Sequence, residues 1–209
     1  MEYVPLHCHS VFSFHAGVCT VSELVRRAKG LGAKAVALTD TDRISGLIQF
    51  YLECRQAGIK PVLGVELTQP GEPNESVVIL AKNSAGYGDL CEIVTRRHLD
   101  PHFTYSKAFS KYWPNLFLFT NFPHLLGQIA RTPNRVNLYG ELVNNSERTR
   151  KRSKQLEKKA LSLGIPLMVS SDSYYLHPDD WEIHRILVAI GLNATLSRLK
   201  PEEYAPRNA

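Results

Sequence analysis

Long apolar runs are missing from this sequence of 209 residues. No stretch of 18 consecutive apolar residues occurs, which excludes a conventional transmembrane helix. The N-terminal stretch MEYVPLHCHS also lacks the basic start and apolar segment of a signal peptide. We therefore expect a cytoplasmic protein with no membrane partner.

Two kinds of short motif are also missing. The four cysteines, Cys8, Cys19, Cys54 and Cys91, show no CxxC spacing, so they indicate reduced, mostly buried thiols and not a disulfide framework or a zinc finger. Neither GxGxxG nor GxxxxGK[ST] occurs, so the sequence carries no glycine-rich loop of a dinucleotide-binding or P-loop fold.

Apolar residues and positive charge are both present. Hydrophobic residues make up 44% of the chain, which is ample for a core. The formal net charge is +5, and much of the excess lies in SERTRKRSKQLEKK, residues 146–159. This stretch fits the solvated face of an outer helix, or a nucleic-acid patch without interleaved aromatic residues. Charge alone leaves both interpretations open.

The hydrophobic pattern predicts alternating strands and helices. The strands are expected at residues 3–9, 35–40, 60–68, 76–81, 116–120, 135–142 and 165–172. Helices are expected from a T-x-x-E capping box at 20–23 to Gly32, over about 44–57, 86–98, 124–130 and 147–163, and after Pro178. Because the strands are apolar runs with little alternation, a parallel sheet buried on both faces is predicted. Seven such units favour an α/β, TIM-like (β/α)7 barrel.

The end of the chain has a different character. The tail SRLKPEEYAPRNA has no apolar period. We expect a barrel domain over residues 1–195 and a connector over residues 196–209 that leads toward a further domain.

Polar side chains stand at the predicted strand ends, where the chemistry of such barrels collects. They are His7, His9, Asp40, Glu66, Asn121 (with His124 three residues later) and Asp172, while His98 ends the helix after the fourth strand. His7 and His9 are two residues apart on a strand and share a face. Two imidazoles and two carboxylates suit Zn²⁺, Mn²⁺ or Fe²⁺. Helix capping by Asp40 or an arginine partner for Glu66 would be a purely structural alternative.

The motifs LHCHSVFSFHAG, AVALTDTDRISGLIQFYLECRQAGIKPVLGVEL and GIPLMVSSDSYYLHPDD resemble the PHP (polymerase and histidinol phosphatase) domain. The likeness runs in order across almost the whole chain. It is nearest to the form found at the N-terminus of bacterial DNA polymerase III alpha subunits. LYGEL and the long basic helix after it match the layout of that subgroup.

The resemblance implies a distorted seven-stranded barrel whose rim holds up to three divalent metal ions for phosphoester hydrolysis. In polymerase alpha subunits such a domain is either a proofreading exonuclease or an inactive structural part. By the resemblance, one metal site would consist of His7, His9, Glu66 and Asp172, all of which are present.

Other positions depart from the family pattern. A second site would use Glu66, His98 and the residue at Asn121, and a third would use His15 with Thr41 and Tyr174, where the family has histidines. Asp40 matches the aspartate of the second motif. Because amide and hydroxyl oxygens are poor substitutes for imidazole or thiolate, we expect at most one bound ion and weak or absent hydrolysis.

Three functions stay open at this point. The first is a largely non-catalytic PHP domain of a bacterial C-family DNA polymerase that serves in DNA replication or repair. The domain would contact DNA through its parent polymerase and would also contact other polymerase domains or replisome subunits. The second is an active metal-dependent phosphoesterase, either a 3′–5′ exonuclease or a histidinol-phosphatase-like enzyme. The third is a barrel with no nucleic-acid role.

Overall fold

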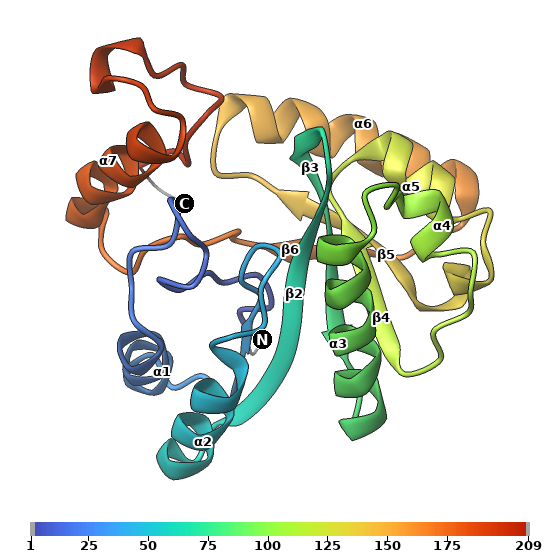
Figure 1. Ribbon diagram of the computed structural model, residues 1–209, viewed down its shortest axis with the longest axis horizontal. Coiled ribbons are helices and arrows are strands. Elements are labelled where there is room, and N and C mark those ends of the chain that lie inside the picture. The colour runs from blue at the N-terminus through green and yellow to red at the C-terminus, as the bar shows by residue number, and fades with distance from the viewer. Residues whose placement is uncertain (1–2, 208–209) are drawn as a thin grey trace.

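A curled six-stranded sheet forms the centre of the computed structural model, which describes residues 3–207 except for the side chain at position 73 (Figure 1). The strands lie in the order of the chain, from β1 at one edge to β6 at the other. Their bounds are β1 Ala35–Leu38, β2 Lys60–Gln69, β3 Glu72–Ala81, β4 Leu116–Thr120, β5 Leu138–Val143 and β6 Leu167–Ser170.

One strand runs against the others. β1 pairs with β2 in parallel, and β4, β5 and β6 are parallel to one another, but β3 is antiparallel to both of its neighbours. A short turn containing Gly71, whose φ is 85°, joins β2 to β3 and leaves no room for a crossover helix. The expectation of a fully parallel sheet was therefore wrong at β3, because apolar strands buried on both faces look alike in either direction.

An extended segment takes the place of the predicted first strand. Residues 5–9 form only an isolated bridge, between Cys8 and Ser173, and belong to no ladder. On one side the carbonyls of Pro5 and Cys8 accept hydrogen bonds from β1 and from Thr39 just after it. On the other side His7 and His9 exchange backbone hydrogen bonds with Ser173, beyond β6. The segment thus joins the two edges of the curled sheet, and the predicted α/β barrel class is confirmed with six strands in the ladder.

Seven α-helices surround this sheet in the described part of the chain. They are α1 Val21–Gly30, α2 Leu47–Ala57, α3 Ser84–Leu99, α4 Tyr105–Ala108, α5 Pro123–Ile129, α6 Glu147–Leu163 and α7 Trp181–Gly191. Figure 1 shows α1 and α2 beside one end of the sheet, with α5 and α6 packed together at the other. α4 was not predicted, and a 3-10 turn at Pro133–Asn137 replaces the start of the predicted strand 135–142.

Both faces of the sheet are buried. A large apolar cluster fills the space between the strands and the helices, and includes Val77 and Ile79 of β3. The alternate residues Val78 and Leu80 belong to a second, smaller cluster with Phe119 on the inner side of the curl. Because successive strand residues point to opposite faces, this two-sided burial accounts for the continuous apolar runs in the sequence.

The longest helix follows its sequence signals closely. Ser146 caps the start of α6 by accepting a hydrogen bond from the Thr149 backbone, and Gly164 ends it with a φ of 63°. Its buried side chains are Ser153, Leu156 and Ala160, so the lysines and arginines lie on its other faces. Within residues 3–207, no helix combines the length and apolar character needed to cross a membrane.

Candidate metal centre

Three side chains of types that bind metals meet where residues 5–9 join the two edges of the curled sheet, a place called the seam from here on. His7 and His9 come from the N-terminal segment, and Asp172 comes from the loop after β6. One atom of each lies within 4.8 Å of the others. Asp172 has a φ of 53°, a left-handed conformation that is uncommon outside glycine and is often found at functional sites.

The atoms that face each other have no hydrogen-bond partner. His7 Nε2, His9 Nε2 and Asp172 Oδ1 are buried and unsatisfied. The two nitrogens lie 3.6 and 3.5 Å from the Asp172 oxygen, which is longer than an ordinary hydrogen bond. Buried polar atoms are nearly always paired, so three such atoms turned toward one point form a candidate cation site.

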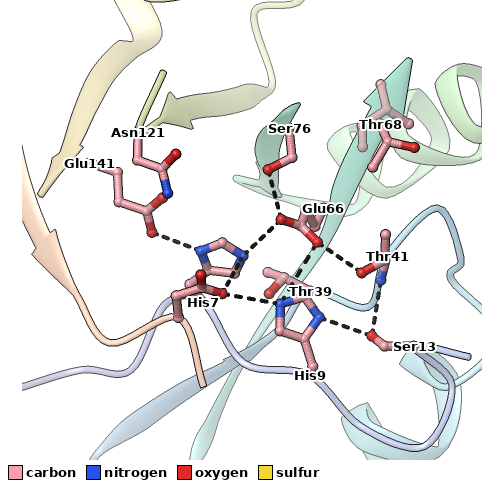
Figure 2. A network of polar contacts seen from close by, with 12 residues as sticks. His7, His9, Ser13, Thr39, Thr41, Glu66, Thr68, Ser76, Asn121 and Glu141 are labelled. Carbon is pink, nitrogen blue, oxygen red and sulfur yellow. Dashed lines mark hydrogen bonds and ion pairs between the residues drawn. The ribbon is translucent and has the colours of Figure 1, made fainter. Parts of the chain in front are cut away.

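Glu66, on β2, stands beside this group. Its Oε1 lies 3.6 Å from His7 Nε2, and its Oε2 lies 3.9 Å from His9 Nε2 (Figure 2). The hydroxyls of Ser76 and Thr41 donate to these two oxygens, at 2.7 and 2.8 Å. Glu66 is therefore held in place with each oxygen turned toward one histidine.

A buried carboxylate orients His7. His7 Nδ1 lies 2.8 Å from Glu141 Oε1, and the Ser170 hydroxyl donates to the same oxygen. Because a carboxylate only accepts, the Nδ1 proton is fixed and Nε2 is the nitrogen that must be free when a cation binds. Such a carboxylate–histidine pair is the usual support of a metal-ligating imidazole.

A hydroxyl relay orients His9. The Ser13 hydroxyl lies 2.7 Å from Asp40 Oδ1 and donates its only proton there. Its oxygen is therefore left to accept from His9 Nδ1–H, at 2.9 Å. His9 Nε2 then presents a lone pair to the cluster.

Charge in the site favours a bound cation. Burial opposes a charge on His7, but the Glu141 and Asp172 carboxylates outweigh it and raise the pKa of the imidazole well above its usual value. Burial would likewise raise the pKa of Glu66, but the close approach of His7 and the charges of both histidines lower it. The cluster thus prefers ionised carboxylates around a positive charge, which a proton or a metal ion can supply.

The positions that depart from the family pattern also lie at this site. The Tyr174 ring stacks on His9, with centroids 4.2 Å apart and planes 5° apart. Burial first, and then the Asp172 charge, raise the pKa of the Tyr174 phenol, so it stays neutral. Thr41 is bonded to Glu66, while the Asn121 side-chain oxygen accepts a hydrogen bond from Arg152 Nη1 at 3.1 Å. These three side chains thus have protein partners.

Four other predicted residues lie apart from the cluster. Asp40 is buried, and its oxygens accept from the Ser10 backbone, the Ser10 hydroxyl and the Ser13 hydroxyl, so here it shapes the loop that carries His9. His15 is exposed, has a φ of 64° and lies close to Gly191 of α7. His98 is exposed on α3, where its Nε2 contacts the Asp42 carbonyl oxygen. His124 pairs instead with Glu75, at 2.8 Å.

Sequence reasoning missed Glu141, Ser13 and Arg152. Glu141 carried a signal, because a carboxylate within the apolar stretch LYGEL must find a buried partner. Ser13 and Arg152 carried none, since serine and arginine are ordinary residues in a loop and on a basic helix.

A cleft of about 870 Å³ opens onto the cluster. Glu66, Asp172 and Tyr174 are among the residues that line it. Arg148, Lys151 and Arg152 of α6 line it as well, together with residues 201–206 near the C-terminus. The cluster is thus reached through a cleft with a basic helix on its border.

The fold and the site together define an α/β barrel-like protein with a candidate divalent-metal centre built from two histidines and carboxylates. The family model of the PHP domain matches residues 5–176, and the chain belongs to this family.

Curated relatives include bacterial DNA polymerases. The chain is 27% identical to DNA polymerase III subunit alpha of Borreliella burgdorferi, over 96% of this chain and 21% of that protein. It is 25% identical to the same subunit of Aquifex aeolicus, over 99% of this chain and 21% of the other. A segment covering 47% of the chain is 39% identical to an error-prone DNA polymerase of Ralstonia nicotianae, of which it covers 9%. The chain thus spans about a fifth of the alpha subunits that it matches.

Solved structures share the fold. A two-domain protein of Bacteroides vulgatus, described as containing a predicted PHP-like metal-dependent phosphoesterase, superposes with a TM-score of 0.54 at 16% identity, over 87% of this chain and 55% of that one. An amidohydrolase of Chromobacterium violaceum superposes with a TM-score of 0.51 at 15% identity, over 82% and 87%. At these identities the likeness shows the fold alone.

Proposed function

We propose that this chain is a PHP domain of the bacterial C-family DNA polymerase type, which binds one divalent cation and has weak or absent hydrolytic activity. The observation that supports this most directly is the group of three buried, unpaired atoms, His7 Nε2, His9 Nε2 and Asp172 Oδ1. An uncompensated group of this kind is costly unless a cation completes it.

The side chains present fit a borderline metal. His7, His9 and Asp172 would hold the ion, Glu66 would complete or balance the site, and Glu141 and Ser13 would orient the two imidazoles. Imidazole and carboxylate suit Zn²⁺, Mn²⁺ or Fe²⁺. Such an ion supplies Lewis acidity and lowers the pKa of a bound water. The chain itself contributes orientation, a buried environment and access through the cleft.

Weak hydrolysis follows from the chemistry of three other side chains. Thr41 and Tyr174 offer neutral hydroxyls, and Asn121 offers an amide that is already bonded to Arg152. A phosphodiester attack needs several positive charges around the phosphate, and a single ion neutralises less of the developing charge.

The polymerase relatives support the rest of the proposal. Two alpha subunits align with nearly the whole chain, at 27% and 25% identity. In that setting the domain would act in DNA replication or repair in the cytoplasm. It would contact DNA as part of a polymerase and would also contact other polymerase domains or replisome subunits.

Metal content tests the proposal. We expect elemental analysis of the purified chain, reconstituted with Zn²⁺ or Mn²⁺ and desalted, to find at most one ion per chain. His9→Ala should abolish that binding, whereas His124→Ala, a histidine paired with Glu75 instead, should leave it unchanged. Two or three tightly bound ions would contradict the single-site proposal.

An active phosphoesterase is the second candidate, because the cleft leads directly to the cluster. Hydrolysis of bis(p-nitrophenyl) phosphate that is lost in His9→Ala would support it. Conversely, the combined change Thr41→His, Asn121→Cys and Tyr174→His should raise metal content and hydrolysis above the unmodified chain if these positions limit the site. No gain in bound metal would argue against that explanation.

A further inference from the structure

Residues 201–206, which we call the strap, form part of the wall of the cleft that opens onto the cluster. Figure 1 shows that the chain leaves α7, passes the start of α6 and returns to α7. The strap contains no helix or strand, and residues 201–203 are exposed while residues 204–206 are half-buried. The segment therefore packs on the molecule without belonging to its core.

Side chains from elsewhere in the fold bind the main chain of the strap. Arg148 Nη1, in the first turn of α6, donates to the Glu202 carbonyl oxygen at 3.0 Å. The Tyr175 hydroxyl donates to the Pro206 carbonyl oxygen. Each such bond replaces a hydrogen bond to water and contributes only modestly to stability. The strap is thus held by several separate, individually weak contacts.

Ala205 is bonded through both of its main-chain groups. Trp181 Nε1 donates to the Ala205 carbonyl oxygen at 3.0 Å, and the Ala205 N–H donates to His184 Nε2 at 2.9 Å. His184 Nδ1 lies 2.7 Å from the Ala16 carbonyl oxygen, which only accepts, so Nδ1 carries the proton and Nε2 is left to accept. The buried His184 thus joins the strap to α7 and to the loop of residues 10–19.

The same histidine adjoins the cluster. The Tyr174 ring lies 5.3 Å from the His184 ring and 4.2 Å from the His9 ring, measured between centroids. Asp172, Tyr174, His184 and the strap all line one cleft. The strap therefore borders the path that leads from solvent to the cluster.

Charge favours this position of the strap, but burial does little to secure it. Glu202 and Glu203 of the strap share the cleft with Arg148, Lys151 and Arg152 of α6. Opposite charges in one cleft attract each other, and salt weakens the attraction. A segment with few buried apolar contacts belongs to the parts of a protein that open at the lowest cost in free energy.

We infer that the strap is a detachable segment that slows the exchange of a metal ion between solvent and the cluster. The inference rests on the proposed function, because the ion would bind at the cluster. The strap supplies none of the candidate ligands, so its release opens the cleft without changing the site. A barrier of this kind changes the rates of metal binding and release by the same factor and leaves Kd unchanged.

The double variant Trp181→Phe/Ala205→Pro removes both main-chain bonds of Ala205. Phenylalanine keeps a ring beside Tyr204, and proline has no N–H to donate. We expect a Glu-specific protease to cleave the metal-free double variant after Glu203 about tenfold faster or more than the parent, because losing two hydrogen bonds raises the detached fraction. The matched control Ala205→Ser keeps the N–H and should be cleaved like the parent.

Diethyl pyrocarbonate, which acylates accessible neutral imidazoles, measures access to the cluster in the metal-free chain. We expect His9, whose Nε2 is unpaired, to be acylated about tenfold faster in the double variant. His124, which is exposed and does not line the cleft, should react at the same rate in both chains. In the Zn²⁺-loaded chain, transfer of Zn²⁺ to a chelator should be faster by a similar factor, with unchanged Kd.

The outcomes separate the strap from the metal centre. Faster cleavage after Glu203 without faster acylation of His9 would overturn the inference, since the strap would then leave access unchanged. Equal cleavage in the parent and the double variant would also overturn it. Faster Zn²⁺ release with an equally weakened Kd would assign the strap a structural role only. Faster acylation of His9 in a chain that binds no Zn²⁺ would support the strap and contradict the metal centre.

A second variant covers loss of fold. If the double variant unfolds, as judged by circular dichroism, Arg148→Ala takes its place. Arg148 is exposed, and its removal breaks the bond to the Glu202 carbonyl. The same measurements and the same outcomes then apply.

Discussion

His7 and His9 present the same nitrogen to the site but are supported differently. The His7 imidazole is bonded to the Glu141 carboxylate, whereas the His9 imidazole is bonded to the Ser13 hydroxyl, which is itself bonded to Asp40. A charged acceptor makes an imidazole a stronger ligand than a neutral one does. We therefore expect Glu141 to raise the cation affinity of the site through His7, although Glu141 is not itself one of the candidate ligands.

Glu141→Gln tests this difference. The amide can still accept the His7 Nδ1–H bond but carries no charge, so we expect the affinity for Zn²⁺ to fall about tenfold to a hundredfold. Competition with a chromophoric chelator measures that affinity. Glu157→Gln, an exposed carboxylate on α6, should bind Zn²⁺ like the parent chain. Equal affinities in the two variants would show that Glu141 does not tune the site.

At the scale of elements, the β2–β3 hairpin positions Glu66. In the antiparallel register Glu66 is opposite Val78 and Thr68 is opposite Ser76, so Glu66 and Ser76 are diagonal neighbours on one face. The Ser76 hydroxyl can then reach Glu66, at 2.7 Å. A parallel strand with a crossover helix would not bring this pair together so directly.

Gly64 shows how tightly β2 is packed. A Cβ at this position would lie 2.7 Å from the Ile79 carbonyl oxygen and 2.5 Å from a Leu80 methyl group. We expect Gly64→Ala to lower the free energy of unfolding by about 1–3 kcal/mol in urea denaturation, because the backbone of β3 has to move. Gly88→Ala on α3 meets no atom within 4 Å and should be neutral or stabilising by up to about 1 kcal/mol. Similar losses in both variants would contradict the packing argument.

At the scale of the whole molecule, the candidate ligands come from distant parts of the chain. His7 and His9 lie in the segment that joins the two sheet edges, Glu66 lies on β2, and Asp172 follows β6. A cation bound to them would link the seam of the curled sheet to its interior. Metal binding and global stability should therefore be coupled.

Removing the metal should lower the melting temperature. At a free Zn²⁺ concentration about a hundredfold above Kd, the ion adds about 2.7 kcal/mol to the stability of the folded chain. For a chain of this size, that corresponds to a decrease of about 5–10 °C on chelation, measured by differential scanning calorimetry. His9→Ala should melt at the same temperature with and without chelator. A chelator that leaves the parent chain unaffected would contradict the coupling.

Much of the architecture was predictable from local signals. Helices α1 and α6 begin after the capping residues Thr20 and Ser146. Helices α2 and α6 end at glycines, at positions 58 and 164, that adopt the left-handed conformation. The direction of β3 was not predictable from burial, because a strand covered on both faces is apolar either way. The segment around Pro5 looked like a strand, but it forms irregular hydrogen bonds to both neighbours.

The candidate site was predictable only in part. His7, His9, Glu66 and Asp172 were predicted to converge, and the structure places them next to each other. Their occupancy by a metal stays a prediction. Asp40 also stands at a predicted strand end, yet its carboxylate oxygens accept hydrogen bonds from Ser10 and Ser13. Whether a carboxylate can bind a metal or is already bonded within the protein depends on the donors around it, which the sequence does not reveal.

By itself, the sequence determined the α/β class, the order of the elements and the residue types that could serve as ligands, because these follow from local periodicity, capping and strand ends. Only the tertiary structure decided that β3 is reversed, that residues 5–9 join the sheet edges, and that Glu141, Ser13 and Arg152 support or border the cluster. These features depend on contacts between residues far apart in the chain, and such contacts leave no pattern in a single sequence.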